Sequence, residues 1–347
     1  MKMLGLLLTL LFAPFNVLTL PLSFEFPADQ LLLQPASSPF IETETAAAPS
    51  SAVKLVYQFQ DRVALENLAS RSNGHLVLTA SNQPIVYAMN PNTRNAKPIS
   101  VFRVPGVTGL TGVVETAPDV FAVVAGNWST ETFRATPGSF SVWSVDFNTP
   151  QPTGKIIASI PEASALNGLT TLEGSRDIIL GADSAVGIIR RLNVTSGEHN
   201  VAIESPLFAP TKLVPLGVNG LCTFDGQLYF LNSAQGSYGR VPLKADGSAA
   251  GEVQILARIN LPTIYDDFDM DWAGTAWVAT HANMLTQITV EGKQRNTTGT
   301  GSDTAMIQPT SAQFGRGSKE AENTIYMTTA GNNTVGGQVL AINLCLT

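Results

Sequence analysis

The sequence lacks the features that mark several large classes of protein. Only 14% of its 347 residues are charged and the net charge is −7, and no Lys/Arg cluster offers a surface for nucleic acid. Two cysteines and three histidines are too few for a disulfide-rich scaffold, and their spacing does not match a zinc site. There is no Ser-His-Asp order and no glycine-rich phosphate loop. We therefore expect neither a nucleic-acid partner nor one of these common active sites.

Long apolar runs are also scarce, and the one at the N-terminus is short. It follows Lys2, extends from Met3 to Ala13 and is interrupted by Pro14, which is typical of a signal peptide and too short for a membrane span. We expect residues 1–20 to be a signal peptide, residues 21–53 to be a Pro/Ser/Ala-rich arm, and the protein to be in the secretory pathway, secreted or vesicular. Four glycosylation sequons agree with this route; they begin at Asn127, Asn193, Asn296 and Asn332.

The two cysteines are Cys222 and Cys345. In an oxidising compartment they would be expected to form a single disulfide. The alternative is a pair of free, buried thiols, and the sequence leaves this open.

No helical periodicity is present after Val53, and a repeat of paired strands takes its place. Six segments each contain a short strand, a turn and a strongly apolar strand, as in "VNGLCTFDGQLYFLNSA", and the repeat recurs every 43–55 residues. A period of this length with three to four strands per unit predicts an all-β fold, a six-bladed β-propeller over residues 54–347. The strand "AVKLVYQFQ" precedes the first unit, and we expect it to complete the sixth blade.

In a propeller the first strand of each blade lines the central channel. The aligned residues at the start of these strands are therefore expected to converge at one channel mouth; they are Glu66, Gly112, Asn167, Asn219, Asp267 and Thr310. The acidic and aromatic stretch "YDDFD", residues 265–269, is the contribution of the fifth blade. Asp266 and Phe268 are accordingly candidates for substrate contact, and Tyr265 is placed at the rim.

The ends of the second strands should approach the same mouth. They add Trp128, Asn232 and His281 as candidates, and His281 could donate a hydrogen bond or move a proton. Each candidate also has a structural interpretation. Asn and Asp residues often satisfy backbone groups in turns, Phe268 could simply be a core residue, and His281 could bind loop backbone.

The oxygen-bearing side chains among these residues could hold a metal ion. Glu66, Asn219 and Asp267, with Asn167, form a hard oxygen donor set suited to Ca²⁺ or another divalent cation. In a lactonase such an ion polarises a carbonyl group or activates water.

Several segments resemble a known superfamily. "LENLA", "LNGLT", "VNGLC…LYFLNS" and "DDFDMDWAGTAWVA" resemble the regucalcin/gluconolactonase propellers, and in particular their secreted fungal branch. The resemblance covers about residues 54–345. It implies that Glu66 is the acidic inner-strand residue, that Asn219 is the Asn of the "NG" pair, and that the Asp266/Asp267 pair supplies the second acid. The fungal branch includes hetero-Diels–Alderases of tropolone–sesquiterpene biosynthesis, which join an ortho-quinone methide to humulene.

Three functions follow from these observations. The first is a hetero-Diels–Alderase that acts on apolar small molecules without a required cofactor, with Tyr265, His281 and Asp267 as catalytic residues. The second is a metal-dependent lactonase or esterase, and the third is a binding module without catalytic activity. The lactonases usually carry "EGP-W" where this chain has "ENLAS", and "PDG" where it has "DDF". These departures favour the pericyclase.

Overall fold

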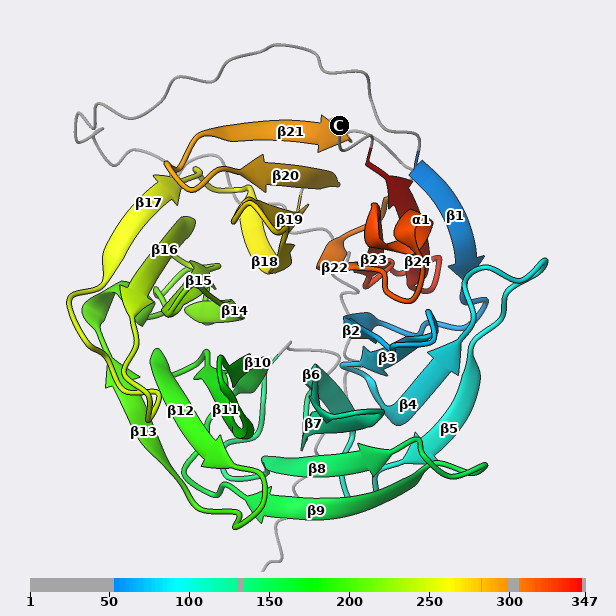
Figure 1. The fold of residues 1–347 in the computed structure, drawn as a ribbon, viewed down its shortest axis with the longest axis horizontal. Coiled ribbons are helices and arrows are strands. Elements are labelled where there is room, and N and C mark those ends of the chain that lie inside the picture. Colours follow the sequence, from blue (N-terminus) through cyan, green and yellow to red (C-terminus); the bar gives the residue numbers. More distant parts are fainter. Residues whose placement is uncertain (1–52, 130–133, 282, 299–305, 345–347) are drawn as a thin grey trace, which may run out of the picture.

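The computed structural model describes residues 53–129, 134–281, 283–298 and 306–344. Six four-stranded antiparallel sheets are arranged in a ring around a central channel (Figure 1). The predicted six-bladed β-propeller is therefore confirmed. The predicted signal peptide, and all of the predicted arm except Val53, lie outside the described residues.

Each blade has its innermost strand first. Blade one contains β2 (Leu65–Ser70), β3 (Leu76–Ala80), β4 (Gln83–Met89) and β5 (Ile99–Arg103), and blade two contains β6 (Gly109–Ala117), β7 (Val120–Gly126), β8 (Ser141–Asp146) and β9 (Thr153–Ser159). Blade three contains β10 (Leu166–Leu172), β11 (Ser175–Asp183), β12 (Ile188–Asn193) and β13 (His199–Glu204). Blade four contains β14 (Val218–Phe224), β15 (Gln227–Asn232), β16 (Ser237–Pro242) and β17 (Gln254–Arg258).

Blade five contains β18 (Ile264–Met270), β19 (Ala276–His281), β20 (Met284–Ile288) and β21 (Gln294–Thr298), and blade six contains β22 (Pro309–Phe314), β23 (Thr324–Thr329), β24 (Gln338–Asn343) and β1 (Val53–Gln58). Two short helices, η2 (Pro206–Phe208) and α1 (Lys319–Glu322), lie in connections between strands. Within the described ranges no helix is long and apolar enough to cross a membrane.

The ring is closed by the N-terminal strand. β1 pairs antiparallel with β24, and its register runs from Val53 opposite Ile342 to Gln58 opposite Gln338. The N-terminal strand thus forms the outer edge of the last blade, as the sequence predicts. The two ends of the described chain are hydrogen-bonded together, so the ring cannot open without breaking this pairing.

The core lies within and between the blades. Alternate residues of each strand face one side of the sheet, so the apolar residues of neighbouring blades meet. One such cluster joins blades three and four, where the rings of Phe208 and Phe230 pack edge to face with centroids 4.8 Å apart. Fully burying one such side chain stabilises the fold by roughly 1.5–3 kcal/mol. The contact between blades is therefore a packed core, and it fixes how the inner strands are placed around the axis.

The inner strands approach one another most closely near their first residues. All six show a register shift at this point, so that the pairing with the second strand skips the next one or two residues. In three blades the second of the two skipped residues is a glycine. A side chain at this position would collide with the neighbouring inner strand. A Cβ on Gly168 would lie 2.4 Å from the Asn219 carbonyl oxygen, and one on Gly220 would lie 2.5 Å from Asp267 Oδ1.

The glycosylation sequons lie at strand ends, turns and an outer strand. Asn296 and Asn332 are exposed, whereas Asn127 and Asn193 are half-buried. Asn332 Oδ1 accepts hydrogen bonds from the backbone of Thr334 and Val335, which is the usual role of Asn in a turn. Glycosylation at these sites remains a prediction.

The structure describes only one of the two cysteines. Cys222 lies on β14, beside Asp267 and Asp269 of the neighbouring inner strand, and burial raises the pKa of its thiol. Cys345 lies outside the described residues. The disulfide therefore remains a prediction.

Candidate active site at the channel mouth

The register shift decides which residues reach the mouth. Leu65, Leu110, Leu166, Val218, Tyr265 and Pro309 are the last paired residues before the shift in their blades. The residues that follow them are therefore equivalent, and they are Glu66, Thr111, Asn167, Asn219, Asp266 and Thr310. The predicted alignment is correct in four blades and wrong by one position in two. Thr111 replaces Gly112, and Asp266 replaces Asp267.

Asp266 lies at the centre of a hydrogen-bond network. Its Oδ2 is 2.8 Å from His281 Nε2, and its Oδ1 accepts a hydrogen bond of 2.7 Å from Asn219 Nδ2. The same amide nitrogen donates to Ser233 Oγ at 3.1 Å, and Ser233 in turn donates to the Tyr265 carbonyl oxygen at 2.8 Å. His281 is the last residue of β19 and lies opposite Ile264. Pairing between β18 and β19 therefore brings imidazole and carboxylate together.

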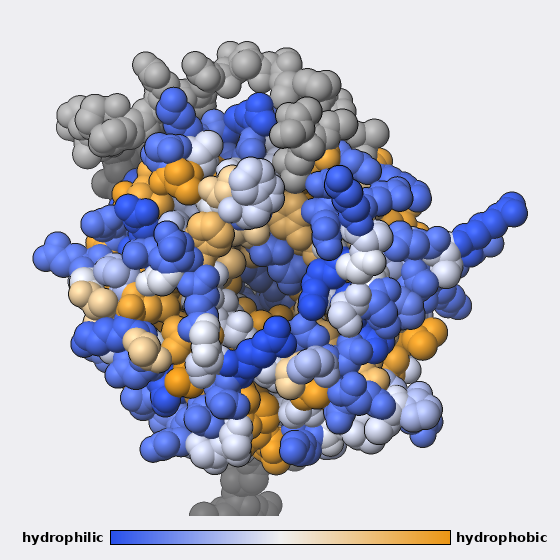
Figure 2. Space-filling model, in the orientation of Figure 1, coloured by the Kyte–Doolittle hydropathy of each residue, from blue (hydrophilic) through white to orange (hydrophobic). Residues whose placement is uncertain are grey.

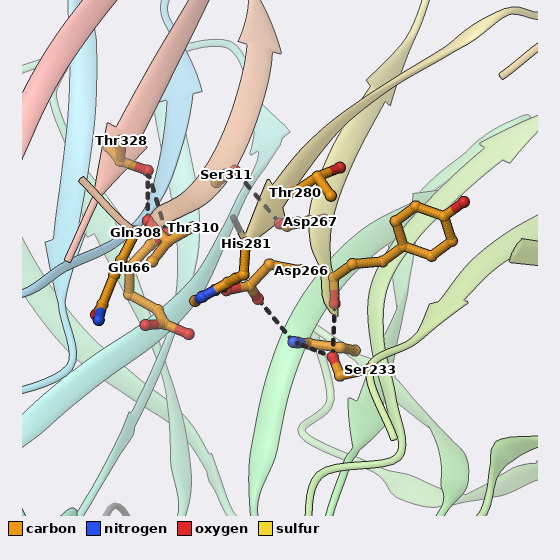
Figure 3. Close-up of polar contacts among 12 residues, drawn as sticks. Glu66, Ser233, Asp266, Asp267, Thr280, His281, Gln308, Thr310, Ser311 and Thr328 are labelled. Atoms are coloured by element: carbon orange, nitrogen blue, oxygen red, sulfur yellow. Dashed lines mark hydrogen bonds and ion pairs between the residues drawn. The ribbon is translucent and has the colours of Figure 1, made fainter. Parts of the chain in front are cut away.

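Glu66 faces Asp266 from blade one. Figure 3 shows its side chain in the same region as those of Asp266 and His281. Burial, and then the charge of Asp266, raise the pKa of Glu66 well above its ordinary value, and hydrogen bonds to Asn167 and Ser81 only partly oppose the shift. Two carboxyl groups in one enclosed space cannot easily both ionise. Glu66 therefore keeps its proton to a higher pH than an ordinary glutamate, and in its protonated form it can donate a hydrogen bond.

Asn167 completes the mouth from blade three. Its side chain is hydrogen-bonded to Glu66, and the residue is only 2% exposed. Its Oδ1 is buried and has no hydrogen-bond partner within the described part of the chain. Unsatisfied buried acceptors are uncommon, so this oxygen is a position at which a bound group would supply the missing hydrogen bond.

Asp267 lies behind the mouth. Its Oδ1 accepts a hydrogen bond of 2.8 Å from the backbone of Phe268, and Ser311 Oγ lies 3.4 Å from its Oδ2. The side chain is half-buried, and desolvation raises its pKa to about 8. Asp267 thus belongs to the channel wall next to Gly220, not to the Asp266–His281 network.

Tyr265 is not at the rim, and that placement is wrong. It is fully buried in the cluster between blades four and five, with Phe268 and Tyr238. Its hydroxyl donates to Gln294 Oε1 on the outermost strand of the blade. The ring points away from the channel because Tyr265 precedes the register shift and keeps the orientation of an ordinary core residue.

Three further candidates have structural roles. Phe268 packs in the same cluster, edge to face with Tyr238. Asn232 is fully buried and donates to the carbonyl oxygens of Leu207 and Ala209, so it holds the connection that contains η2. Trp128 packs edge to face on Phe140 in the core between blades two and three. The prediction that these side chains form the substrate pocket is not supported by these contacts.

Two serines of the site have no counterpart in the sequence prediction. Ser233 follows Asn232 directly, and Ser81 follows β3. Both occupy the position just after the second strand of a blade, and His281 ends the second strand of blade five. A search of this position in every blade would have found them.

The arrangement of the oxygen donors at the mouth determines whether they fit a divalent cation. Glu66, Asn167, Asn219 and Asp266 are oxygen-bearing side chains of the required kind. However, Asn219 turns its amide nitrogen toward Asp266, and the other Asp266 oxygen is taken by His281. Asp267, predicted as a ligand, is bonded elsewhere. Among the described residues no group of three or more His, Cys, Asp and Glu side chains is placed to hold a metal ion. As arranged, the residues do not fit the ion.

A cavity of about 260 Å³ lies at the other end of β18, beside Met270, Trp272 and α1. Asp266 is near the first residue of β18 and Met270 is the last. This cavity is therefore on the opposite face of the ring from the network. Figure 2 shows the central hollow of the ring, which is lined largely by hydrophilic residues.

Comparisons with known proteins find similar chains in sequence and in structure. No protein-family model matches the chain. A Phoma protein named "Putative hetero-Diels-Alderase" is 26% identical, with 83% of this chain and 91% of that protein covered. One of the same designation from Sarocladium schorii is 23% identical, with 87% and 82% covered.

The similar solved structures are six-bladed propellers of the regucalcin type. A luciferin-regenerating enzyme has a TM-score of 0.61 and 13% identity, with 85% of this chain and 96% of that chain covered. A calcium-binding regucalcin from Agrobacterium tumefaciens has a TM-score of 0.61 and 12% identity, with 84% and 94% covered. At these identities the structures establish the fold alone. The predicted resemblance, to hetero-Diels–Alderases in sequence and to regucalcin-like propellers in structure, is confirmed.

Proposed function

We propose that the protein is an enzyme of the hetero-Diels–Alderase type, and that the channel mouth around Glu66, Asp266 and His281 is its active site. It would join an ortho-quinone methide to an alkene such as humulene. The observation that carries the proposal is the Glu66 carboxyl group, with its raised pKa, beside the Asp266–His281 pair at the channel mouth. The names of the similar fungal proteins supply the reaction class.

The chemistry requires a hydrogen-bond donor more than a base. In the cycloaddition, new bonds form between the alkene and both the oxygen and the exocyclic carbon of the quinone methide. Charge builds up on that oxygen as the ring becomes aromatic. A preorganised donor in a desolvated site stabilises such charge strongly, and a carboxylic acid kept neutral by burial serves as one. Protonated Glu66 would fill this role.

The remaining groups would orient the reactants. Asn167 Oδ1, which has no hydrogen-bond partner among the described residues, would accept a hydrogen bond from a substrate hydroxyl. The Asp266–His281 pair would bind a second polar group of the substrate. The substrate can reach His281 because the side chain is 30% exposed. Loops at the same end of the ring carry the exposed apolar residues Val186 and Leu213, which suit an alkene. Holding two reactants in a near-attack geometry lowers the entropic part of the barrier.

A metal-dependent lactonase is the second candidate. It is favoured by one observation, the presence of oxygen-bearing side chains at equivalent positions of blades one, three, four and five. The hydrogen bonds to both Asp266 oxygens stand against it. A chelator distinguishes the two candidates, because only the lactonase needs the ion.

The experiment is an assay with a quinone-methide precursor and humulene, followed by chiral chromatography. The proposal expects one stereoisomer to form faster than in the protein-free control, and expects EDTA to leave the rate unchanged. A racemic product at the uncatalysed rate would refute the proposal. Hydrolysis of a lactone panel that EDTA abolishes would establish the alternative.

A further inference from the structure

The channel mouth has the composition of a cation site without its geometry. Glu66, Asn167, Asn219 and Asp266 occupy equivalent positions in four blades. Carboxylate and amide oxygens are the ligands that Ca²⁺ prefers. A second observation is independent of the acids: Asn167 Oδ1 is buried and lacks a partner within the described residues, although its side chain reaches Glu66.

His281 holds the place that an ion would need. Its Nε2 lies 2.8 Å from Asp266 Oδ2, and Asn219 Nδ2 lies 2.7 Å from Oδ1. An ion bound to Asp266 would have to displace at least one of these nitrogens. The position of His281 is set by β-pairing, since it lies directly opposite Ile264, two residues before Asp266. The obstruction is therefore built into blade five.

We infer that His281 takes the place of a divalent cation in this propeller, and that removing its imidazole opens a cation site formed by Glu66, Asn167, Asn219 and Asp266. Removing one partner of a buried polar pair leaves the other uncompensated. In a variant without the imidazole, a cation would satisfy Asp266, and Asn219 could turn its amide oxygen inward. The inference does not depend on the reaction that the enzyme catalyses.

The test measures ion binding, not activity. Tb³⁺ luminescence and the shift of the melting temperature with Ca²⁺ are recorded for the full-length wild type, His281→Ala and His281→Ala/Asp266→Asn. His281→Ala should bind Tb³⁺ at least roughly tenfold more tightly than the wild type, which corresponds to about 1.4 kcal/mol. Its melting temperature should rise with Ca²⁺, because a ligand that binds only the folded state stabilises it. The double variant should lose both effects.

The matched control is His75→Ala. His75 lies at the turn between β2 and β3, at the other end of the ring, and this variant should bind like the wild type. Near-UV circular dichroism establishes folding. If His281→Ala is unfolded, His281→Asn, whose side chain is shorter, replaces it. The inference would be overturned if the wild type bound Tb³⁺ as tightly as His281→Ala, or if a folded His281→Ala protein bound it no more tightly than the wild type. It would also be overturned if the double variant with Asp266→Asn kept the higher affinity.

Discussion

Asp267 is one of the residues that make the stability of this protein depend on pH. Burial raises its pKa to about 8, whereas an unfolded chain has an ordinary value near 3.9. A carboxyl group with a raised pKa in the folded state favours folding at low pH, and this contribution is lost as pH rises from about 4 to about 8. The ionised form is the one that the fold tolerates poorly.

We therefore predict that Asp267→Asn stabilises the protein at pH 8.5 more than at pH 5. The amide has a similar shape and carries no charge to desolvate. Melting temperatures measured at both pH values check this, with about 2–4 °C expected for each kcal/mol in a domain of roughly this size. A variant that is equally or more destabilised at the higher pH would contradict the assignment.

Tyr265 tests the difference between core and site. Tyr265→Phe removes the hydroxyl that bonds Gln294 and leaves the buried ring in place. We expect a loss of about 1 kcal/mol in the free energy of unfolding and an unchanged catalytic rate. Urea denaturation measures the first quantity. If the folded variant had a catalytic rate reduced by more than about tenfold, Tyr265 would belong to the active site after all.

At the scale of the strand, the register shift explains both what could be predicted and what could not. The repeat length and the alternation of apolar residues determine the six blades, because they depend only on strand periodicity. Which residue faces the mouth depends on a bulge, in which two residues oppose one on the partner strand. The sequence "YDDFD" has acids on both sides of that point. An alignment without the bulge therefore selects Asp267, whereas the hydrogen bonds select Asp266.

The same argument separates the neighbours Asn232 and Ser233. Both are small polar residues at the end of an apolar strand, and composition alone does not distinguish them. Asn232 still pairs with Val218 and holds a loop, whereas Ser233, one residue further, reaches Asn219. His281 lies at the mouth, where the sequence places it, because its strand ends there. Its partner could only be found once β18 and β19 were in register.

The close approach of inner strands gives a prediction at this scale. In Gly220→Ala the new methyl carbon would lie 2.5 Å from Asp267 Oδ1 and 2.7 Å from Asp267 Cα. The backbone would have to move, and we expect the free energy of unfolding to fall by roughly 1–3 kcal/mol or more. Thermal unfolding of the variant measures this loss.

The control for that variant is Gly226→Ala in the same blade. Gly226 has a φ of +69° and no atom of a neighbour within 4 Å of the added carbon. Gly226→Ala should lower the free energy of unfolding by only about 1 kcal/mol, which is the strain of placing alanine in a left-handed backbone conformation. If the two variants were equally stable, the inner strands would not be in the predicted contact.

At the scale of the whole molecule, the closing strand β1 holds the ring together, and the ring holds the residues of the channel mouth in place. The network at the mouth joins β14, β18 and β19, and Glu66 comes from blade one, next to the closure. Opening the ring would therefore separate Glu66 from Asp266. The arrangement of the candidate active site therefore depends on the closed ring.

The predicted secretory route also concerns the whole chain. If the N-terminal segment is a signal peptide, the exposed sequons at Asn296 and Asn332 should carry glycans. We predict that the protein from a fungal host runs heavier on a gel than its sequence mass of 36.8 kDa. Endoglycosidase treatment should remove the difference. Unchanged mobility would exclude the glycoprotein.

The central claim is that the reaction takes place at the mouth formed by Glu66, Asp266 and His281. Its most direct test is the rate of cycloaddition, above the protein-free background, for the wild type, Glu66→Ala, His281→Ala and Tyr265→Phe. Loss of one preorganised donor should reduce the rate by roughly 10²–10³-fold in the first two variants, and Tyr265→Phe should match the wild type. Folded Glu66→Ala and His281→Ala proteins with the wild-type rate would contradict the claim.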